Sequence, residues 1–154
     1  MYTKILVPLD GSKMAEMALP YVEWFIKVSH VNEIVFLQAI EPFRIPGGIE
    51  GTIIPEERTR IEQDAAKLAA RYLGKIKRRF KTGKMIVQSR VIVGKPSKVI
   101  SDYVAECDVD LIIMATHGYS RIHRLVSGSV ADEILHAAKV PIFLVNPRDR
   151  PPDK

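Results

Sequence analysis

Few of the residues that accompany export, membrane insertion or disulfide cross-linking occur in this chain. Its 154 residues include one cysteine, Cys107, so no internal disulfide can form. No apolar run approaches the roughly 20 residues that a membrane span requires. Residues 1–4 lead directly into a strand-like segment, so we expect no signal peptide and a reducing, cytoplasmic location. Cys107 falls on the apolar face of a predicted helix and is expected to be a packed thiol.

The familiar signatures of nucleotide, metal and catalytic sites are also absent. No Gly-rich dinucleotide fingerprint follows the first predicted strand, and no Walker-type loop occurs. His117 and His123 lack a recognised metal spacing, so no metal site is predicted. Because no activated nucleophile, paired base or strong carboxylate cluster is apparent, no catalytic residue is assigned.

Charge and aromatic content disfavour a nucleic-acid partner. The net charge of +5 suits anionic ligands, but it is diffuse. Its densest basic cluster, at residues 75–84, lacks the repeated aromatic residues that base stacking uses. We therefore expect this cluster to be a solvated helix end, where the helix dipole favours cations.

Apolar segments that alternate between strand and helix patterns make up most of the chain. We predict one domain over residues 1–147 and a frayed, Pro-rich tail over 148–154. The predicted strands are 4–9, 33–40, 85–93, 111–115 and 141–145, and the predicted helices are 12–28, 56–80, 96–107 and 128–138. Such alternation is typical of a three-layer, doubly wound α/β fold of the Rossmann-like type, with five parallel strands and helices on both faces.

The strand patterns also predict the order of the strands. Segments 4–9, 33–40 and 111–115 are almost continuously apolar, as strands buried on both faces should be, whereas segment 85–93 alternates like an edge strand. The simplest order is 3-2-1-4-5. Strand 141–145 is then an apolar edge, and we expect the same strand of a second subunit to cover it in a homodimer. The alternative cover is the C-terminal tail.

Helical spacing predicts which side chains face the core. Leu68 falls on the apolar face of helix 56–80, and Leu135 falls on that of helix 128–138. Pro20 lies inside helix 12–28 and is expected to kink it. The Gly/Pro-rich segment 41–55 is long for a connection in one compact domain, so we expect it to be mobile or functional.

Residues 111–130 are the most informative part of the chain. An apolar strand leads into a loop with Gly118 and then to Gly128-Ser129, where a helix is predicted to begin. The free N–H groups and the dipole of a helix N-terminus attract anions, and glycine permits close approach. The predicted chain reversal lies beside this point, where open α/β sheets bind ligands. The alternative is that Gly118 is only a turn residue and Ser129 only a helix cap.

Single residues near this point also have two readings. Asp10 either accepts a hydrogen bond from a ribose hydroxyl or caps the first helix. Arg121 either neutralises phosphates or belongs to a solvated face, and His117 either contacts phosphate or orders its own loop.

The phrases at the two ends of this loop, MATHG and SGSV, resemble the universal stress protein family. KILVPLDGS, ALPYV, VGKP and VPIFLV also resemble that family, in the same order, so the likeness runs over residues 4–145. The family's nucleotide-binding members carry Gly, two residues, Gly, nine residues and then Gly-Ser or Gly-Thr. The resemblance implies an adenine nucleotide, usually ATP but also ADP or AMP, with Mg²⁺ or Mn²⁺ as its accompanying cation.

The family's binding residues carry over onto both sides of the predicted switch point. Pro8, Leu9 and Asp10 would border adenine and ribose, and Ala39 would lie against the base. The strand end and the loop after it would contact the phosphates through Ala115, Gly118, Gly128, Ser129 and Val130. Met114, at the end of the same strand, and Arg121, which follows the loop, are added to the predicted nucleotide-binding residues. Ala115 replaces the first glycine of the motif, so its backbone must avoid positive φ. Ala39 stands where valine is common and enlarges the base pocket.

Three functions remain open from the sequence. The first is a dimeric ATP-binding protein of stress response or signalling, whose loops recognise an unknown protein partner when nucleotide binds. The second is a slow ATPase or nucleotidyl enzyme, for which the sequence offers no catalytic group. The third is a dimerisation module that has lost its ligand, which the alanine at position 115 suggests.

Overall fold

The computed structural model describes residues 2–42, 55–81, 83–116 and 130–146. Its strands are β1 (Lys4–Pro8), β2 (Glu33–Ile40), β3 (Ile86–Val93), β4 (Leu111–Ala115) and β5 (Ile142–Val145). Its helices are the 3₁₀ helix η1 (Ala15–Ala18), α1 (Leu19–Val28), α2 (Pro55–Phe80), α3 (Pro96–Glu106) and α5 (Val130–Ala137).

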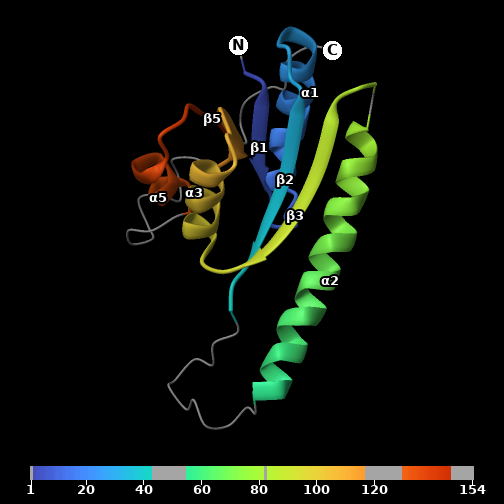
Figure 1. Ribbon diagram of the computed structural model, residues 1–154, viewed down its shortest axis with the longest axis vertical. Coiled ribbons are helices and arrows are strands. Elements are labelled where there is room, and N and C mark those ends of the chain that lie inside the picture. Colours follow the sequence, from blue (N-terminus) through green and yellow to red (C-terminus); the bar gives the residue numbers. More distant parts are fainter. Residues whose placement is uncertain (1, 43–54, 82, 117–129, 147–154) are drawn as a thin grey trace.

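All five strands are parallel and lie in the order β3-β2-β1-β4-β5, which confirms the predicted topology. Helices α1 and α2 pack on one face of the sheet, and α3 and α5 pack on the other (Figure 1). The chain reverses its direction of winding at β1, which pairs with β2 on one side and β4 on the other. A ligand site of an open α/β sheet is therefore expected beside the carboxyl ends of β1 and β4.

The central strands are buried on both faces, as their apolar sequences predict. In β1, Ile5 and Val7 contribute to the core beneath α1 and α2, whereas Leu6 contributes to the core beneath α3 and α5. All three side chains are 0% exposed. Burying an aliphatic side chain of this size contributes roughly 1.5–3 kcal/mol to folding, so these strands hold the three layers together.

Helix α2 is longer than the strand against which it packs. Its 26 residues span roughly 39 Å at 1.5 Å per residue, whereas the eight residues of β3 span roughly 26 Å. Figure 1 shows its N-terminal half extending past the ends of the strands. The predicted burial of Leu68 is wrong for a different reason: this side chain is 65% exposed because it lies on the outward side of α2, away from the buried stripe of Ala69, Leu73, Ile76 and Phe80.

Three other local predictions need correction. Pro20 does not kink a helix, because the segment is divided into η1 and α1, and Pro20 lies in the first turn of α1, where a missing N–H breaks no helical bond. Leu135 is 48% exposed, since the short α5 buries only Ile134. Cys107 follows the end of α3 as its half-buried C-cap residue rather than lying on its apolar face.

Among the described residues, no helix has the length and apolar composition that crossing a membrane requires. The bounds proposed for the domain (1–147) and the tail (148–154) stay predictions. Most of the segment 41–55, and residues 128–129 at the predicted start of the last helix, lie outside the described residues.

Candidate functional site at the carboxyl ends of the strands

The carboxyl end of β1 delivers Asp10 to the edge of the sheet. Pro8 and Leu9 are buried, and the Leu9 N–H donates to the Leu37 carbonyl oxygen at 2.8 Å, which extends the ladder with β2 by one residue. Asp10 is the first exposed residue after this strand. The register of the sheet therefore fixes the position of a carboxylate beside the switch point.

The turn after β1 is built around Asp10, Gly11 and Ser12. Asp10 Oδ1 accepts a hydrogen bond from the Ser12 N–H at 2.8 Å, and Ser12 Oγ accepts one from the Ala15 N–H at 3.1 Å. Gly11 has φ of 82°, a conformation that glycine adopts without steric cost. Asp10 therefore closes its own turn and caps neither η1 nor α1, so its predicted capping role is wrong.

Two buried polar atoms near this turn lack a partner within the described residues. They are Gln38 Oε1 and the hydroxyl oxygen of Tyr72. Gln38 follows Phe36 on the α2 side of β2, and a Cβ added to Gly11 would lie 3.9 Å from Gln38 Nε2. Sequence reasoning did not single out these residues, although Gln38 is conspicuous as the only polar side chain within the apolar run 34–40.

The surroundings of Tyr72 are electronegative. Burial is the largest cause that raises the pKa of its hydroxyl above the usual range, followed by the charge of Glu16, the close approach of that carboxylate to the hydroxyl, and the charge of Asp10. The approach of Glu16 falls short of a well-formed hydrogen bond. The phenol therefore stays protonated at neutral pH. An unpaired buried polar atom costs about 1–3 kcal/mol, so a partner for these two atoms from outside the described residues would stabilise this end of the sheet.

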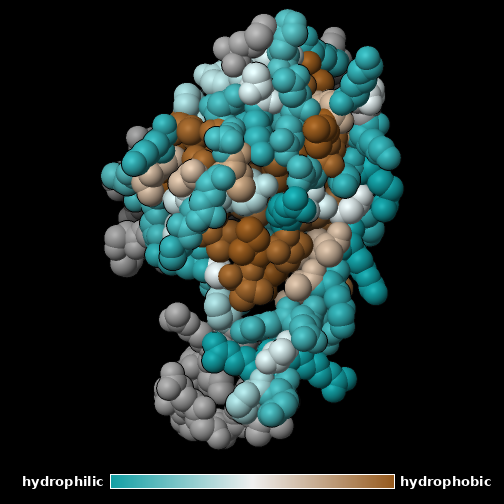
Figure 2. Space-filling view, viewed as in Figure 1, coloured by the Kyte–Doolittle hydropathy of each residue, from teal (hydrophilic) through white to brown (hydrophobic). Residues whose placement is uncertain are grey.

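The carboxyl ends of β2 and β3 present an apolar surface. Ala39 is half-buried and packs on the α3 side of the sheet, beside its register partner Ile92. Val93, at the end of β3, is 48% exposed. Figure 2 shows hydrophobic residues gathered in this part of the surface, between α2 and α3. Ala39, which the resemblance assigns to the base, therefore lies near an exposed apolar surface, and its contact with a base stays a prediction.

The carboxyl end of β4 holds Met114 and Ala115 in extended backbone. Met114 is buried and packs toward α3 and α5, whereas the half-buried Ala115 packs on the other face. Ala115 is the last residue of β4, and Asp108 is the only non-glycine with positive φ among the described residues. The predicted absence of positive φ at Ala115 is confirmed, so its methyl group strains nothing.

The starts of α3 and α5 are joined beside the same edge of the sheet. The Glu133 carboxylate forms an ion pair with Lys95 Nζ at 2.6 Å and accepts a hydrogen bond from Ser97 Oγ at 2.5 Å. These two contacts, Lys95 first, hold the pKa of Glu133 below its usual range. Val130 is the first residue of α5 and is half-buried. Asp132, an acidic residue, follows it in the first turn of this helix.

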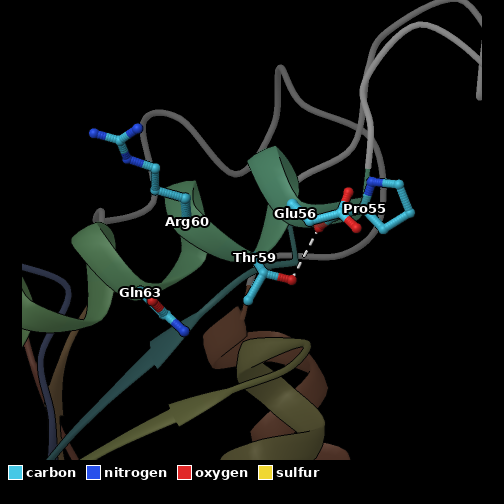
Figure 3. Close-up of a pocket in the computed structure, with 5 residues that line it drawn as sticks. All are labelled: Pro55, Glu56, Thr59, Arg60 and Gln63. Atoms are coloured by element: carbon cyan, nitrogen blue, oxygen red, sulfur yellow. Dashed lines mark hydrogen bonds between the residues drawn. The ribbon is translucent and has the colours of Figure 1, made fainter.

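Neither the arrangement of possible metal ligands nor the shape of the surface indicates a second ligand site among the described residues. The described ranges contain no group of three or more His, Cys, Asp or Glu residues placed to hold a metal ion. A shallow pocket occurs at the start of α2, lined by Pro55, Glu56, Thr59, Arg60 and Gln63 (Figure 3). The Thr59 hydroxyl donates to the Pro55 carbonyl oxygen at 2.9 Å, and the side chains of Arg60 and Gln63 point in different directions. These side chains do not converge on a ligand.

The sequence model of the universal stress protein family matches residues 1–146. The chain belongs to this family. The universal stress protein MJ0577 of Methanocaldococcus jannaschii is 27% identical over 155 residues, covering 94% of this chain and 95% of the relative. The solved structure of MJ0577 has a TM-score of 0.78 at 26% identity, and the match covers 97% of this chain and 99% of that one.

Two more distant solved structures of the family share the fold. A universal stress protein in complex with cAMP has a TM-score of 0.60 at 21% identity, with 94% of this chain and 97% of that chain covered. A family member from Arabidopsis thaliana with AMP bound has a TM-score of 0.56 at 13% identity, with 94% and 91% covered.

The structure brings together the half of the predicted site that lies on the strands. The ends of β1, β2 and β4 place Pro8, Leu9, Asp10, Ala39, Met114 and Ala115 along one edge of the sheet, and Val130 begins α5. The other predicted residues, Gly118, Arg121, Gly128 and Ser129, lie outside the described residues, as does His117. Their contacts with phosphate stay predictions.

Proposed function

We propose that this universal stress protein binds an adenine nucleotide, with ATP as the expected form, at the carboxyl ends of β1, β2 and β4. The observation that carries the proposal is the reversal at β1 in the order β3-β2-β1-β4-β5, with Asp10 exposed beside it. Family members with cAMP and AMP bound support the choice of an adenine nucleotide.

The described residues can recognise the nucleoside. Asp10 uses one carboxylate oxygen in its own turn, so the second oxygen is left to accept a hydrogen bond from a ribose hydroxyl. Adenine is flat and largely apolar, and the uncovered surface beside Ala39 suits it. A charge-assisted hydrogen bond to the ribose contributes about 1.5–3 kcal/mol, which is a substantial part of micromolar affinity.

The phosphates would be held by the loop 117–129 and the start of α5. Gly118 and Gly128 would let backbone N–H groups approach the phosphate oxygens, Ser129 would add a hydroxyl, and Arg121 would neutralise charge. Since the described residues hold no carboxylate cluster, Mg²⁺ or Mn²⁺ would be bound mainly through the phosphates themselves. The protein would act by binding rather than by fast hydrolysis.

Among the described residues, no strand pairs with the outer edge of β5, and this supports a homodimer. The Pro141 and Val145 carbonyls accept hydrogen bonds from Ile112 and Thr116, so alternate residues of β5 face β4. The intervening residues, Ile142 and Leu144, then direct their N–H and C=O groups away from the sheet. An apolar edge with unpaired backbone groups favours pairing with a second copy. In this dimer, nucleotide binding would alter recognition of a further protein partner.

Calorimetric titration of nucleotide-free protein with ATP and Mg²⁺ tests nucleotide binding. We expect the wild type to bind ATP with a Kd of about 1–10 μM. Gly118→Val should abolish this binding, because the valine side chain blocks the approach of the phosphates to the backbone. Gly74→Ala is the matched control, since Gly74 lies within α2 and a Cβ there meets only Arg78, at 4.0 Å. Binding that survives in Gly118→Val places the phosphates elsewhere, and wild-type protein that binds no adenine nucleotide contradicts the proposal.

Leu144→Pro tests the dimer. Proline removes an N–H that points away from β4, so the sheet keeps its own bonds while the edge loses a donor. We expect sedimentation velocity to show monomers at concentrations where the wild type and Leu144→Val are dimeric. Phe143 is a poorer choice, because its ring packs on Tyr21 and Phe25 at centroid distances of 5.4 and 5.3 Å. A dimeric Leu144→Pro protein excludes this interface.

A further inference from the structure

The outward face of α2 carries a regular pattern of exposed residues that the sheet does not use. The pattern advances by alternating steps of four and three residues, which is the spacing of the contact seam between two long helices. We name this set the α2 seam: Glu57, Ile61, Asp64, Leu68, Arg71, Lys75 and Arg78. Every member is exposed, including the apolar Ile61 at 37% and Leu68 at 65%.

The charges of the α2 seam change sign at Leu68. The charged members before it, Glu57 and Asp64, are acidic, whereas Arg71, Lys75 and Arg78 after it are basic. Over residues 67–80 as a whole, every charged side chain is basic. When the seam is laid against its own reverse about Leu68, both acidic members face basic ones, and Ile61 lies against the aliphatic stem of Lys75.

We infer that two copies of the chain associate through antiparallel α2 helices, with Leu68 on the two-fold axis. In this arrangement Asp64 faces Arg71 of the partner subunit, because these residues lie four before and three after Leu68. Glu57, eleven before, faces Arg78 of the partner subunit, ten after. Each contact occurs twice by symmetry, so the interface gains four pairs of opposite charge around a Leu–Leu contact.

The charge pattern selects this orientation over a parallel one. A parallel pair in register would place Glu57 against its own copy and Arg71 against its own copy, and like charges that close are destabilising. The competing contact within the chain is weak: Asp64 Oδ1 lies 3.1 Å from Lys67 Nζ, with both side chains more than half exposed. Asp64 can therefore exchange Lys67 for the partner subunit's Arg71 at little cost.

The length of α2 makes the seam accessible to a second helix. Its N-terminal half extends beyond the strands (Figure 1), and its buried face uses other residues. Seven seam residues form a small interface compared with the roughly 20–30 residues per side of a stable complex. We therefore expect weak association, with a Kd of about 10–100 μM, that added salt weakens further. This surface is separate from both the nucleotide site and the β5 edge.

Charge reversal tests the pairing directly. We expect Asp64→Lys and Arg71→Glu, each in the Leu144→Pro background, to lower the association constant at least about tenfold in sedimentation equilibrium at low salt. The double variant Asp64→Lys/Arg71→Glu restores each pair with its signs exchanged, so its association should return to within about threefold of the parent. A double variant as weak as the single variants overturns the inference.

A cysteine at the proposed axis gives a second test, which does not depend on changing the charges of the α2 seam. Leu68→Cys in a Cys107→Ser background should form a covalent dimer under mild oxidation, because the two sulfurs meet at the axis. Ala70→Cys in the same background is the control, since it is exposed on another side of the same helix. If Leu68→Cys cross-links no more than Ala70→Cys, something other than a second copy covers the seam, and the inference is wrong.

Discussion

The two ends of the sheet satisfy their polar groups to different degrees. At the amino end, Asp110 accepts hydrogen bonds from the Thr3 N–H, the Thr3 hydroxyl and the Lys4 N–H at 2.8, 2.8 and 3.2 Å, and Glu33 pairs with Lys4 at 3.3 Å. At the carboxyl end, buried polar atoms of Gln38 and Tyr72 have no partner in the part of the chain that the structure describes. Within the described residues, the polar groups at the amino end are paired, whereas two of those at the carboxyl end are not.

The largest expected effect on stability comes from Asp110→Ala at the amino end. The change leaves the Thr3 and Lys4 N–H groups without their acceptor, so we expect the free energy of unfolding to fall by about 2–3 kcal/mol in urea titrations. Asp110→Asn, which keeps one carbonyl acceptor, should cost about half as much. Nucleotide affinity should not change in either variant, and a large loss of affinity would contradict the separation of the two ends.

Asp10→Asn should have the converse effect at the carboxyl end. The amide oxygen can still accept from the Ser12 N–H, but the negative charge beside the ribose is lost. We expect the Kd for ATP to rise about tenfold, equivalent to about 1.4 kcal/mol, with the free energy of unfolding changed by less than about 0.5 kcal/mol. Paired calorimetry and urea titration measure both. A drop in stability without loss of affinity would make Asp10 a structural residue only.

Removing one hydroxyl from each end sharpens the comparison further. Thr3→Val deletes a hydroxyl that donates to Asp110 and should cost about 1 kcal/mol. Tyr72→Phe deletes a buried hydroxyl without a partner and should leave the free energy of unfolding unchanged or raise it by up to about 1 kcal/mol. Thermal and urea unfolding of both variants decide the point. Equal losses from the two variants would show that Tyr72 has a partner in the folded chain.

The smallest effect is expected from Glu133→Gln. The folded pKa of Glu133 lies below its unfolded value, so its contribution to stability is present above the unfolded pKa and is lost as the pH falls through the folded pKa. The Tm of the wild type should therefore fall more steeply than that of Glu133→Gln below about pH 5. Parallel Tm profiles for the two proteins would mean that the pairs with Lys95 and Ser97 contribute nothing.

Sequence patterns predict the layers of this fold better than the ends of its elements. The apolar runs of β1, β2 and β4 predict burial on both faces, and that burial places these strands at the centre of the sheet. Helical periodicity predicted burial of Leu68 wrongly, because the apolar residues of α2 occupy more than one side of the helix and only the side of Ala69, Leu73, Ile76 and Phe80 is buried. Pro20 was misplaced because the break between η1 and α1 depends on how the turn after β1 is closed.

Sequence patterns likewise predict some residues of the candidate site and miss others. Residues at strand ends, such as Asp10 and Ala115, can be placed from sequence because the parallel register brings all the carboxyl ends to one edge. Tyr72 was not found, because its proximity to Glu16 joins two segments far apart in the chain. Asp110 was missed for the same reason, since its partner Thr3 lies 107 residues away.

Among the described residues, the buried side chains of helix α2 all lie in its second half, so this half is held most firmly against the sheet. Its buried contacts begin at Ala69, so Pro55 lies roughly 20 Å beyond the last point of support at 1.5 Å per residue. A tilt of about 5° at the anchored half moves the free end by roughly 2 Å over that length. A given tilt of the buried half of α2 therefore displaces its first turn further than it displaces the turns that carry Leu73 and Ile76.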